Sequence, residues 1–245
     1  MNFFYSFGEY ISLLEKTFSK PEQRRIYVNR IFNEATSIGV ESLGIVTIIS
    51  LFVGAVTTIN TAYQLTSALI EDSVVGSVVS DSTILELAPT ITSLVLAGKI
   101  GSNIATELGS MRVSEQIDAM EVMGVNSAGY LVFPKIIAAL FMLPCLIIIA
   151  MFLSIMGGMM VGALTGIVSV EDFSEGARES FRTYTLFFAV VKSITFAFII
   201  SSVSSYQGFF VSGGSIEVGK ASTRAVVYSS VLILLSDYML AQLFL

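Results

Sequence analysis

Apolar residues in this chain gather in long runs that are separated by short polar stretches. A helix needs about 20 apolar residues to cross the hydrocarbon core of a bilayer. Runs of that order occur at approximately residues 43–70, 83–108, 133–166, 184–206 and 226–245. The pattern therefore predicts an all-α integral membrane protein with about five transmembrane helices, organised as a single domain over residues 1–245.

The first 34 residues follow a different pattern. Apolar residues recur there at helical spacing with charged residues between them: Phe3, Phe7, Tyr10, Leu14 and Phe18. This spacing is typical of an amphipathic helix in the membrane interface, although an amphipathic helix packed on protein looks the same. Residues 1–34 are accordingly predicted to form interfacial, or elbow, helices.

Charged residues outside the runs predict how the chain crosses the membrane. A basic cluster precedes the first span: Lys16, Lys20, Arg24, Arg25 and Arg30. Because basic segments stay in the cytoplasm, the N-terminus is expected inside and the C-terminus, five crossings later, outside. Arg178 and Arg182 are exceptions, since they lie in a segment, also acidic, that is expected outside.

Composition narrows the possible chemistry. Charged residues make up 13% of the chain, against roughly 25% in a soluble domain. The formal net charge of -6 argues against a nucleic-acid partner. The chain has no histidine and a single cysteine, Cys145, so it offers neither a disulfide framework nor a Cys/His metal site.

One glycine-rich stretch looks like a nucleotide-binding loop. From Gly214 the chain reads G-S-I-E-V-G-K-A, which fits a P-loop except that Ala221 replaces the Ser or Thr that would hold Mg²⁺. The stretch follows a membrane span rather than a strand, so a turn that opens into the last helix is the preferred interpretation. We therefore expect no enzymatic activity and no bound cofactor in this chain, and any ATP hydrolysis in another subunit.

The second span carries two periodic patterns. Small residues recur at every fourth position: Ala97, Gly101, Ala105 and Gly109. Polar residues recur on a neighbouring face: Lys99, Asn103 and Glu107. The first face permits close helix packing, and the second is expected to face protein or water.

A short amphipathic helix is predicted at residues 112–124, between the second and third spans. One side is acidic, with Glu115, Asp118 and Glu121, and the other is apolar, with Val113, Ile117 and Met120. Such a helix can dock into a groove of a cytoplasmic partner, or it can lie solvated on the membrane surface. The pattern alone favours neither alternative.

Two charged residues lie inside the last two predicted spans. Lys192 and Asp237 are each about eight residues from the outer end of their helix, so they share a similar depth. Because either charge alone is expensive in hydrocarbon, we predict a structural ion pair between these spans. A proton or headgroup relay is the alternative.

The third span has another face of small residues, at Gly158, Gly162 and Gly166. Such a face favours close packing within the subunit over a dimer seam. Neighbouring methionines are flexible, apolar and suited to lipid chains: Met156, Met159 and Met160.

The run from Glu107 to Gly124, E-L-G-S-M-R-V-S-E-Q-I-D-A-M-E-V-M-G, closely resembles the signature of the MlaE/YrbE permease family. Further similar segments are Glu86–Pro89, Ala97–Ser102, Lys192–Ser193, Gly219–Ser230 and Asp237. The resemblance extends from about residue 41 to the end of the chain. Members of this family are the membrane subunits of Mce-associated ABC transporters that move phospholipid across the bacterial envelope.

The resemblance implies a homodimer in the bacterial inner membrane that binds two copies of a cytoplasmic ATPase, where ATP and Mg²⁺ would bind. It also implies an Mce-domain protein on the outer side and often a small STAS-domain protein. Residues 207–224 resemble the family's second cytoplasmic loop. The helix at 112–124 is similar to the coupling helix that enters the ATPase groove. The expected coupling residues are Glu107, Arg112, Glu115, Gln116, Ile117, Asp118 and Met120.

A lipid cavity is expected at the outer ends of the first two spans, mostly apolar with polar groups at its rim. Its expected lining is Asn60, Thr61, Gln64, Leu65, Glu86, Leu87 and Thr90. The sequence departs from the family pattern at Leu85, where some members have a basic residue, and at Ala88, where the pattern has Gly.

Two other functions fit the residues. A secondary transporter could use the charged residues of the spans for ion coupling, but such folds usually contain paired repeats, which we do not find. A non-transporting membrane scaffold for an Mce-type protein is the other alternative. ATP dependence distinguishes the first from an ABC permease, and loss of transport without loss of assembly distinguishes the second.

Overall fold

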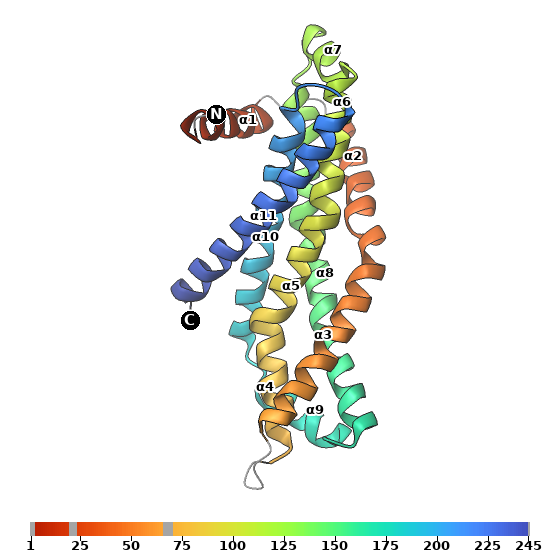
Figure 1. Ribbon diagram of the computed structural model, residues 1–245, viewed down its shortest axis with the longest axis vertical. Coiled ribbons are helices and arrows are strands. Elements are labelled where there is room, and N and C mark those ends of the chain that lie inside the picture. Colours follow the sequence, from red (N-terminus) through yellow and green to blue (C-terminus); the bar gives the residue numbers. More distant parts are fainter. Residues whose placement is uncertain (1–2, 20–23, 66–70, 245) are drawn as a thin grey trace. The chain divides into compact units, whose positions relative to one another are not determined.

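The computed structural model describes residues 3–19, 24–65 and 71–244, and all regular structure within these ranges is helical (Figure 1). The elements are α1 (Phe3–Phe18), α2 (Arg24–Ile38), η1 (Val40–Ser42), α3 (Leu43–Gln64), α4 (Ser73–Ser82), η2 (Thr83–Leu87), α5 (Ala88–Leu96), η3 (Ala97–Gly101), α6 (Ser102–Val113), α7 (Gln116–Val122), α8 (Ser127–Thr165), α9 (Val170–Glu179), α10 (Thr183–Phe209) and α11 (Ser215–Phe244).

Five helical stretches in the described ranges are long and apolar enough to cross a membrane. They are Tyr27–Gln64, Ser73–Val113, Ser127–Thr165, Thr183–Phe209 and Ser215–Phe244. The prediction of an all-α membrane protein with about five transmembrane helices is therefore confirmed. Predictions made for Lys20, for residues 66–70 and for the side chains of Phe3, Arg24 and Arg25 lie outside the described part of the chain.

The last span begins earlier than the sequence suggested. Helix α11 starts at Ser215 rather than near residue 226, because Val218 and Ala221 are buried with Val211 in a small apolar cluster. The connection between α10 and α11 is therefore residues 210–214, which is shorter than the predicted loop of 207–224.

The second span is interrupted by two π-helical turns, η2 and η3. A π turn accommodates one extra residue in a helix and often occurs at functional positions. One charged residue lies in each, Glu86 in η2 and Lys99 in η3. Apolar periodicity gave no sign of these turns.

Contacts divide the chain into two compact units. Unit 1 comprises Met1–Glu41, Leu94–Leu143 and Thr195–Ser236. Unit 2 comprises Ser42–Ser93, Pro144–Ile194 and Asp237–Leu245. The organisation of residues 1–245 as a single transmembrane domain stays a prediction.

In unit 1, small residues bring η3 and α6 close to α10. A Cβ atom built on Gly101 would lie 2.9 Å from Ser204 Oγ, and one built on Gly208 would lie 2.7 Å from the carbonyl oxygen of Ala105. The face of small residues that the sequence singled out in this span is therefore a packing face.

Helix α1 contacts α10 through Tyr10. The Tyr10 hydroxyl donates a hydrogen bond to Ser202 Oγ at 2.9 Å, and its ring meets that of Tyr206 edge-on with centroids 5.8 Å apart. Burial raises the pKa of the Tyr10 hydroxyl above its ordinary value, and the bond to Ser202 partly opposes this shift. Ile11 and Phe18 are exposed on the same helix. The placement of α1 in the membrane interface stays a prediction.

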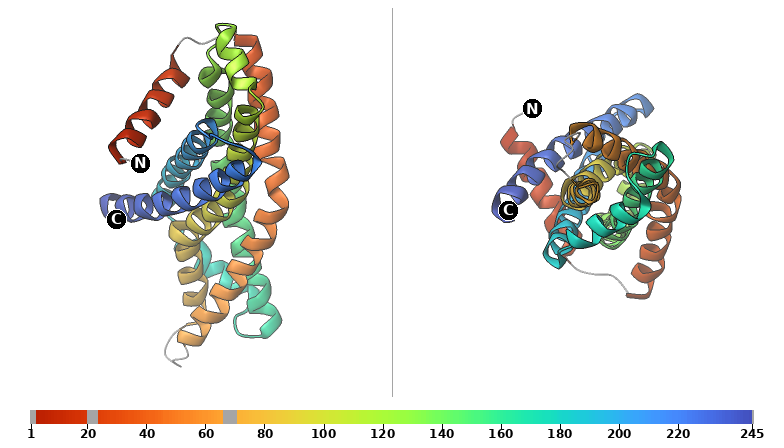
Figure 2. Two further views of the ribbon diagram at one scale, coloured as in Figure 1. Left: turned by 45° about the horizontal axis from the view of Figure 1, so that its top comes forward. Right: turned by 90° about the horizontal axis from the view of Figure 1, so that it is seen from below.

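In unit 2, glycines allow two pairs of helices to pack at backbone distance. Gly54 of α3 abuts the backbone of Ser154 in α8, and Gly76 of α4 abuts that of Phe173 in α9. Helices α4 and α9 lie side by side (Figure 2). Gly158 faces Thr58, so the small face of the third span packs within the chain.

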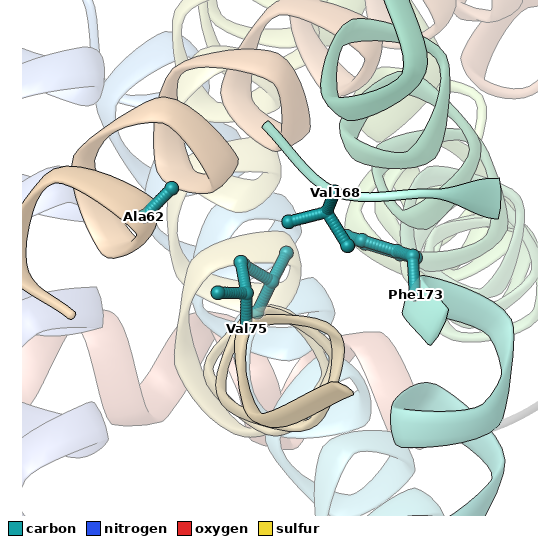
Figure 3. Close-up of a cluster of buried hydrophobic side chains, with 5 residues drawn as sticks. Ala62, Val75, Val168 and Phe173 are labelled. Atoms are coloured by element: carbon teal, nitrogen blue, oxygen red, sulfur yellow. The ribbon is translucent and has the colours of Figure 1, made fainter. Parts of the chain in front are cut away.

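An apolar cluster fills the space between these helices of unit 2 (Figure 3). Its buried members are Ala62, Val75, Val79, Val168 and Phe173. Leu65, Ile155 and Met159 pack against it. Because these residues come from α3, α4, α8, the α8–α9 connection and α9, the cluster fixes four helices of unit 2 together.

Candidate functional site

An ion cluster in unit 2 centres on the buried Lys192 of α10. Its ammonium group lies 2.6 Å from Glu86 Oε2 in η2 and 2.6 Å from Asp237 Oδ1 in α11. The contact with Glu86 is a hydrogen bond, whereas that with Asp237 Oδ1 is an ion pair without hydrogen-bond alignment. The structure therefore brings Lys192 and Asp237 together and adds a second carboxylate.

The π turn supplies a further ligand to this cluster. Lys192 Nζ also donates to the carbonyl oxygen of Leu85, at 3.2 Å, inside η2. Thr90 donates to Asp237 Oδ2 at 2.9 Å, and the ring of Phe188 lies 4.9 Å from Lys192 Nζ. A buried ammonium needs several such partners, because leaving it unpaired is costly.

The residues predicted to line a lipid cavity separate into two groups. Glu86 and Thr90 belong to the Lys192 cluster. Leu87, which follows Glu86 in the sequence, is half-buried. Asn60, Thr61 and Gln64 lie on the last turns of α3, where Asn60 and Gln64 are exposed. Leu65 packs on the apolar cluster. Among the described residues, no side-chain hydrogen bond or ion pair joins Asn60, Thr61 or Gln64 to the Lys192 cluster.

Helices α6 and α7 form a tight corner in unit 1. Arg112, at the end of α6, pairs with Asp118 of α7 at 2.6 Å. Glu115 lies between the helices with a φ of 58°, a left-handed conformation that non-glycine residues rarely adopt. Gln116 Nε2 donates to Ser114 Oγ at 2.9 Å. The predicted helix at 112–124 is therefore shorter in the structure, at Gln116–Val122, because Arg112 and Val113 belong to α6 and the chain turns at Glu115.

The surface of this corner differs from the predicted contact set. Ile117 is fully buried within the chain, so it anchors α7 and is not presented to a partner in this conformation. Glu107 is on α6 and pairs elsewhere. Met120 is half-buried, whereas Glu115 and Gln116 are exposed.

Two apolar residues at the end of α7 were missed by the sequence argument. Val122 is 88% exposed and Met123 is 71% exposed. Exposed apolar side chains next to a polar surface are typical of interaction sites. The signal in the sequence is that two apolar residues directly precede Gly124, where the predicted helix ends.

A polar cavity of about 400 Å³ lies in unit 1. The face of Lys99, Asn103 and Glu107 forms part of its lining, as expected for polar residues of a span. Lys99 Nζ donates to the carbonyl oxygen of Glu41.

A second ion cluster borders the same cavity. Lys135 of α8, which is buried, lies 2.7 Å from Glu34 Oε1 of α2 and 2.6 Å from Glu107 Oε2 of α6. Neither Lys135 nor Glu34 is among the site residues predicted from the sequence. The cluster connects three helices that are far apart in the sequence.

The stretch that looks like a P-loop is helical from Ser215 onward. Lys220 pairs with Glu217 at 2.6 Å on the same helix. From Ser215 onward this stretch is therefore the first part of the last helix rather than the turn that the sequence predicts.

Comparison with known proteins places the chain in a family. It matches the family model described as Permease MlaE over residues 31–243. A probable ABC transporter permease protein of Rickettsia bellii is 37% identical over 89% of this chain and 84% of its own length. A probable ABC transporter permease protein of Synechocystis sp. is 33% identical over 90% of this chain and 84% of its own length.

A plant protein is also similar. Protein TRIGALACTOSYLDIACYLGLYCEROL 1, chloroplastic, of Arabidopsis thaliana is 33% identical over 90% of this chain and 63% of its own length. The family match, the relatives and the five apolar helical stretches identify a multi-pass membrane permease subunit. The chain belongs to the MlaE permease family.

Proposed function

We propose that this chain is the membrane subunit of an ABC transporter that moves phospholipid between the bacterial inner membrane and an Mce-domain partner. ATP is bound and hydrolysed by a separate cytoplasmic ATPase. The transporter contains two copies of the chain, with the N-terminus in the cytoplasm and the C-terminus outside, and a STAS-domain protein can accompany the ATPase.

The observation that carries this proposal is the α6–α7 corner in a chain whose relatives are named as ABC transporter permeases. A short helix held rigidly at the end of a span can transmit the movement of a partner into that span. Glu115, Gln116 and Asp118, with Val122 and Met123, form a mixed acidic and apolar surface that suits a groove on the ATPase.

Two observations support a lipid as cargo. The plant relative carries the name of a glycolipid. In addition, the buried lysines of both units are already paired with carboxylates. The two described clusters therefore leave no unpaired buried charge that could bind a coupling ion. Lipid transport driven by a partner ATPase therefore fits better than ion-coupled transport.

Purification of the tagged chain from its native membrane in mild detergent tests the proposal. We expect an ABC ATPase and phospholipid to copurify, together with ATPase activity. The variant Asp118→Lys should reduce ATPase recovery at least tenfold, because it reverses a charge on the α7 surface. Glu179→Lys in α9 is the matched control and should leave recovery unchanged.

Arg112→Gln separates the two effects of the Asp118 change. It breaks the same salt bridge but leaves the charge on α7 in place, so it should reduce recovery less than Asp118→Lys does. Full ATPase recovery with Asp118→Lys, in a chain that is still folded by size exclusion, would contradict docking at α7. Transport that persists without ATP would favour the ion-coupled alternative.

A further inference from the structure

A second cavity, of about 460 Å³, lies within unit 2. Its volume is in the range of roughly 300–1,000 Å³ that is typical of small-molecule sites. The lining is almost entirely apolar and comes from η2, α4, α8, α9 and α10. None of the residues expected to line the lipid cavity at the ends of the first two spans belongs to it.

One wall of this cavity is a stripe along α8. Ile148, Met151, Phe152, Ile155 and Met159 recur there at helical spacing. From Ile148 to Met159 the stripe is about 16 Å long, at 1.5 Å of rise per residue. A single leaflet of the hydrocarbon core is about 15 Å deep, half of the bilayer's roughly 30 Å. The stripe therefore has the length of one acyl chain in its leaflet.

The single charged residue among those lining the cavity is Arg178 of α9. It is exposed, and no ion pair is recorded for it in the described part of the chain. Helix α9 joins the ends of two apolar helical stretches, α8 and α10, so Arg178 lies where the chain leaves the hydrocarbon. A guanidinium group at that level is a good ligand for a lipid phosphate.

Helix α9 also carries acidic residues, which influence the headgroup that can bind there. They are Glu171, Asp172, Glu175 and Glu179, and none of them lines the cavity. Glu175 is exposed one helical turn before Arg178 and so shares its face. This arrangement repels a second negative charge and attracts an ammonium group next to the phosphate.

We propose that this cavity binds one acyl chain of a zwitterionic phospholipid, with the phosphate on Arg178 and the ammonium group beside Glu175. The site is distinct from the expected transport cavity and does not depend on the proposed transport function. Met151 and Met159 allow the wall to adapt to chains with different bends, because methionine is flexible and apolar.

Photo-cross-linking tests the proposal. The probe is a phosphatidylethanolamine with a diazirine on its acyl chain, and it is added to the full-length protein in nanodiscs that contain no phosphatidylcholine. We expect cross-links at the α8 stripe, located by mass spectrometry. Arg178→Gln should reduce them at least fivefold. Arg182→Gln, four residues further along, is the matched control and should leave them unchanged.

A second pair of variants tests the apolar part of the site. Ile148→Trp fills the cavity and should also reduce cross-linking at least fivefold, whereas Ile149→Trp places the same side chain on a neighbouring residue outside the lining. Unlabelled phosphatidylethanolamine should compete at least fivefold better than phosphatidylglycerol or oleate, and Glu175→Gln should remove this preference.

Three results would overturn the proposal. Cross-linking that is equal in wild type and Arg178→Gln would identify ordinary boundary lipid. Equal competition by oleate or phosphatidylglycerol would exclude recognition of a zwitterionic headgroup. The protein purified with its partners gives the third test. If a partner helix fills the cavity there and no cross-links form along the stripe, lipid occupancy is contradicted.

Discussion

Two buried lysines in this permease hold two carboxylates each, yet their surroundings differ. Lys135 of unit 1 pairs with Glu34 and Glu107, whose side chains are 21% and 48% exposed at the edge of a polar cavity. Lys192 of unit 2 pairs with Asp237, whose side chain is 7% exposed, and with Glu86, whose side chain is 48% exposed. The first cluster is open to a cavity that can hold water, and the second is closed on one side by protein.

The difference in exposure determines how costly it is to break each cluster. Carboxylates beside a polar cavity can be hydrated when their lysine is removed, so the cluster of unit 1 can be made and broken at modest cost. In unit 2 loss of the lysine leaves the buried carboxylate of Asp237 without a cation, which is strongly destabilising, whereas the half-exposed carboxylate of Glu86 can be hydrated. The cluster around Lys192 is therefore a fixed element of the structure, and the cluster around Lys135 is the one suited to rearrangement.

The largest effect is expected for Lys192→Met. This change leaves Glu86 and Asp237 without their shared cation and should destabilise the protein by about 3–5 kcal/mol. Unfolding by SDS in mixed micelles measures the change. Combining it with Asp237→Asn should recover part of the loss, and no recovery would show that the charges are not the cause.

Asp237→Asn alone should have the next largest effect. The lysine keeps Glu86 and the carbonyl of Leu85 but loses its ion pair with Asp237, and the hydrogen bond from Thr90 loses its charged acceptor, so we expect a loss of about 2 kcal/mol. The same unfolding assay measures it, with the proposed lipid transport as a second readout. Unchanged stability and transport in this variant would contradict a structural role for the pair.

Lys135→Met should be milder than Lys192→Met, although it also removes a buried cation that binds two carboxylates. We expect a loss of about 1–2 kcal/mol, because the cavity lets water reach Glu34 and Glu107. A loss as large as that of Lys192→Met would show that the cavity stays dry and would remove the distinction between the clusters.

The smallest effect is expected for Glu107→Gln. Its side chain is about half exposed, so stability should change by less than about 1 kcal/mol. Recovery of the proposed partner ATPase provides the more sensitive readout, since Glu107 is on the helix that ends at the α6–α7 corner. A larger loss of stability than for Asp237→Asn would reverse the order of the two clusters.

The number of spans and the pairing of Lys192 with Asp237 could be argued from the sequence because both depend on local patterns and on depth. The inclusion of Glu86 could not, because the π turn η2 changes the register of its helix and leaves no mark in apolar periodicity. The sequence instead predicts Glu86 in the lining of a lipid cavity, because it lies near the outer end of a span.

The cluster of Lys135 was missed for another reason. Glu34 and Lys135 are 101 residues apart, and their contact depends on how α2 and α8 pack, which no single-sequence pattern specifies. The polar face of Lys99, Asn103 and Glu107 was found because its four-residue repeat is local. The burial of Ile117 depends on the left-handed backbone conformation of Glu115. A glycine at that position would have indicated this conformation in the sequence, whereas a glutamate does not.

The π turn at Thr83–Leu87 also determines which changes of chain length this span can accept. Each residue of an α-helix turns the chain by about 100°, so deleting one residue from the turn would swing Glu86 and the Leu85 carbonyl away from Lys192, even with every side chain intact. Substitutions along this segment alter one contact at a time, whereas a single-residue deletion alters all of them. Natural variants of this segment should therefore differ in residue type far more often than in length.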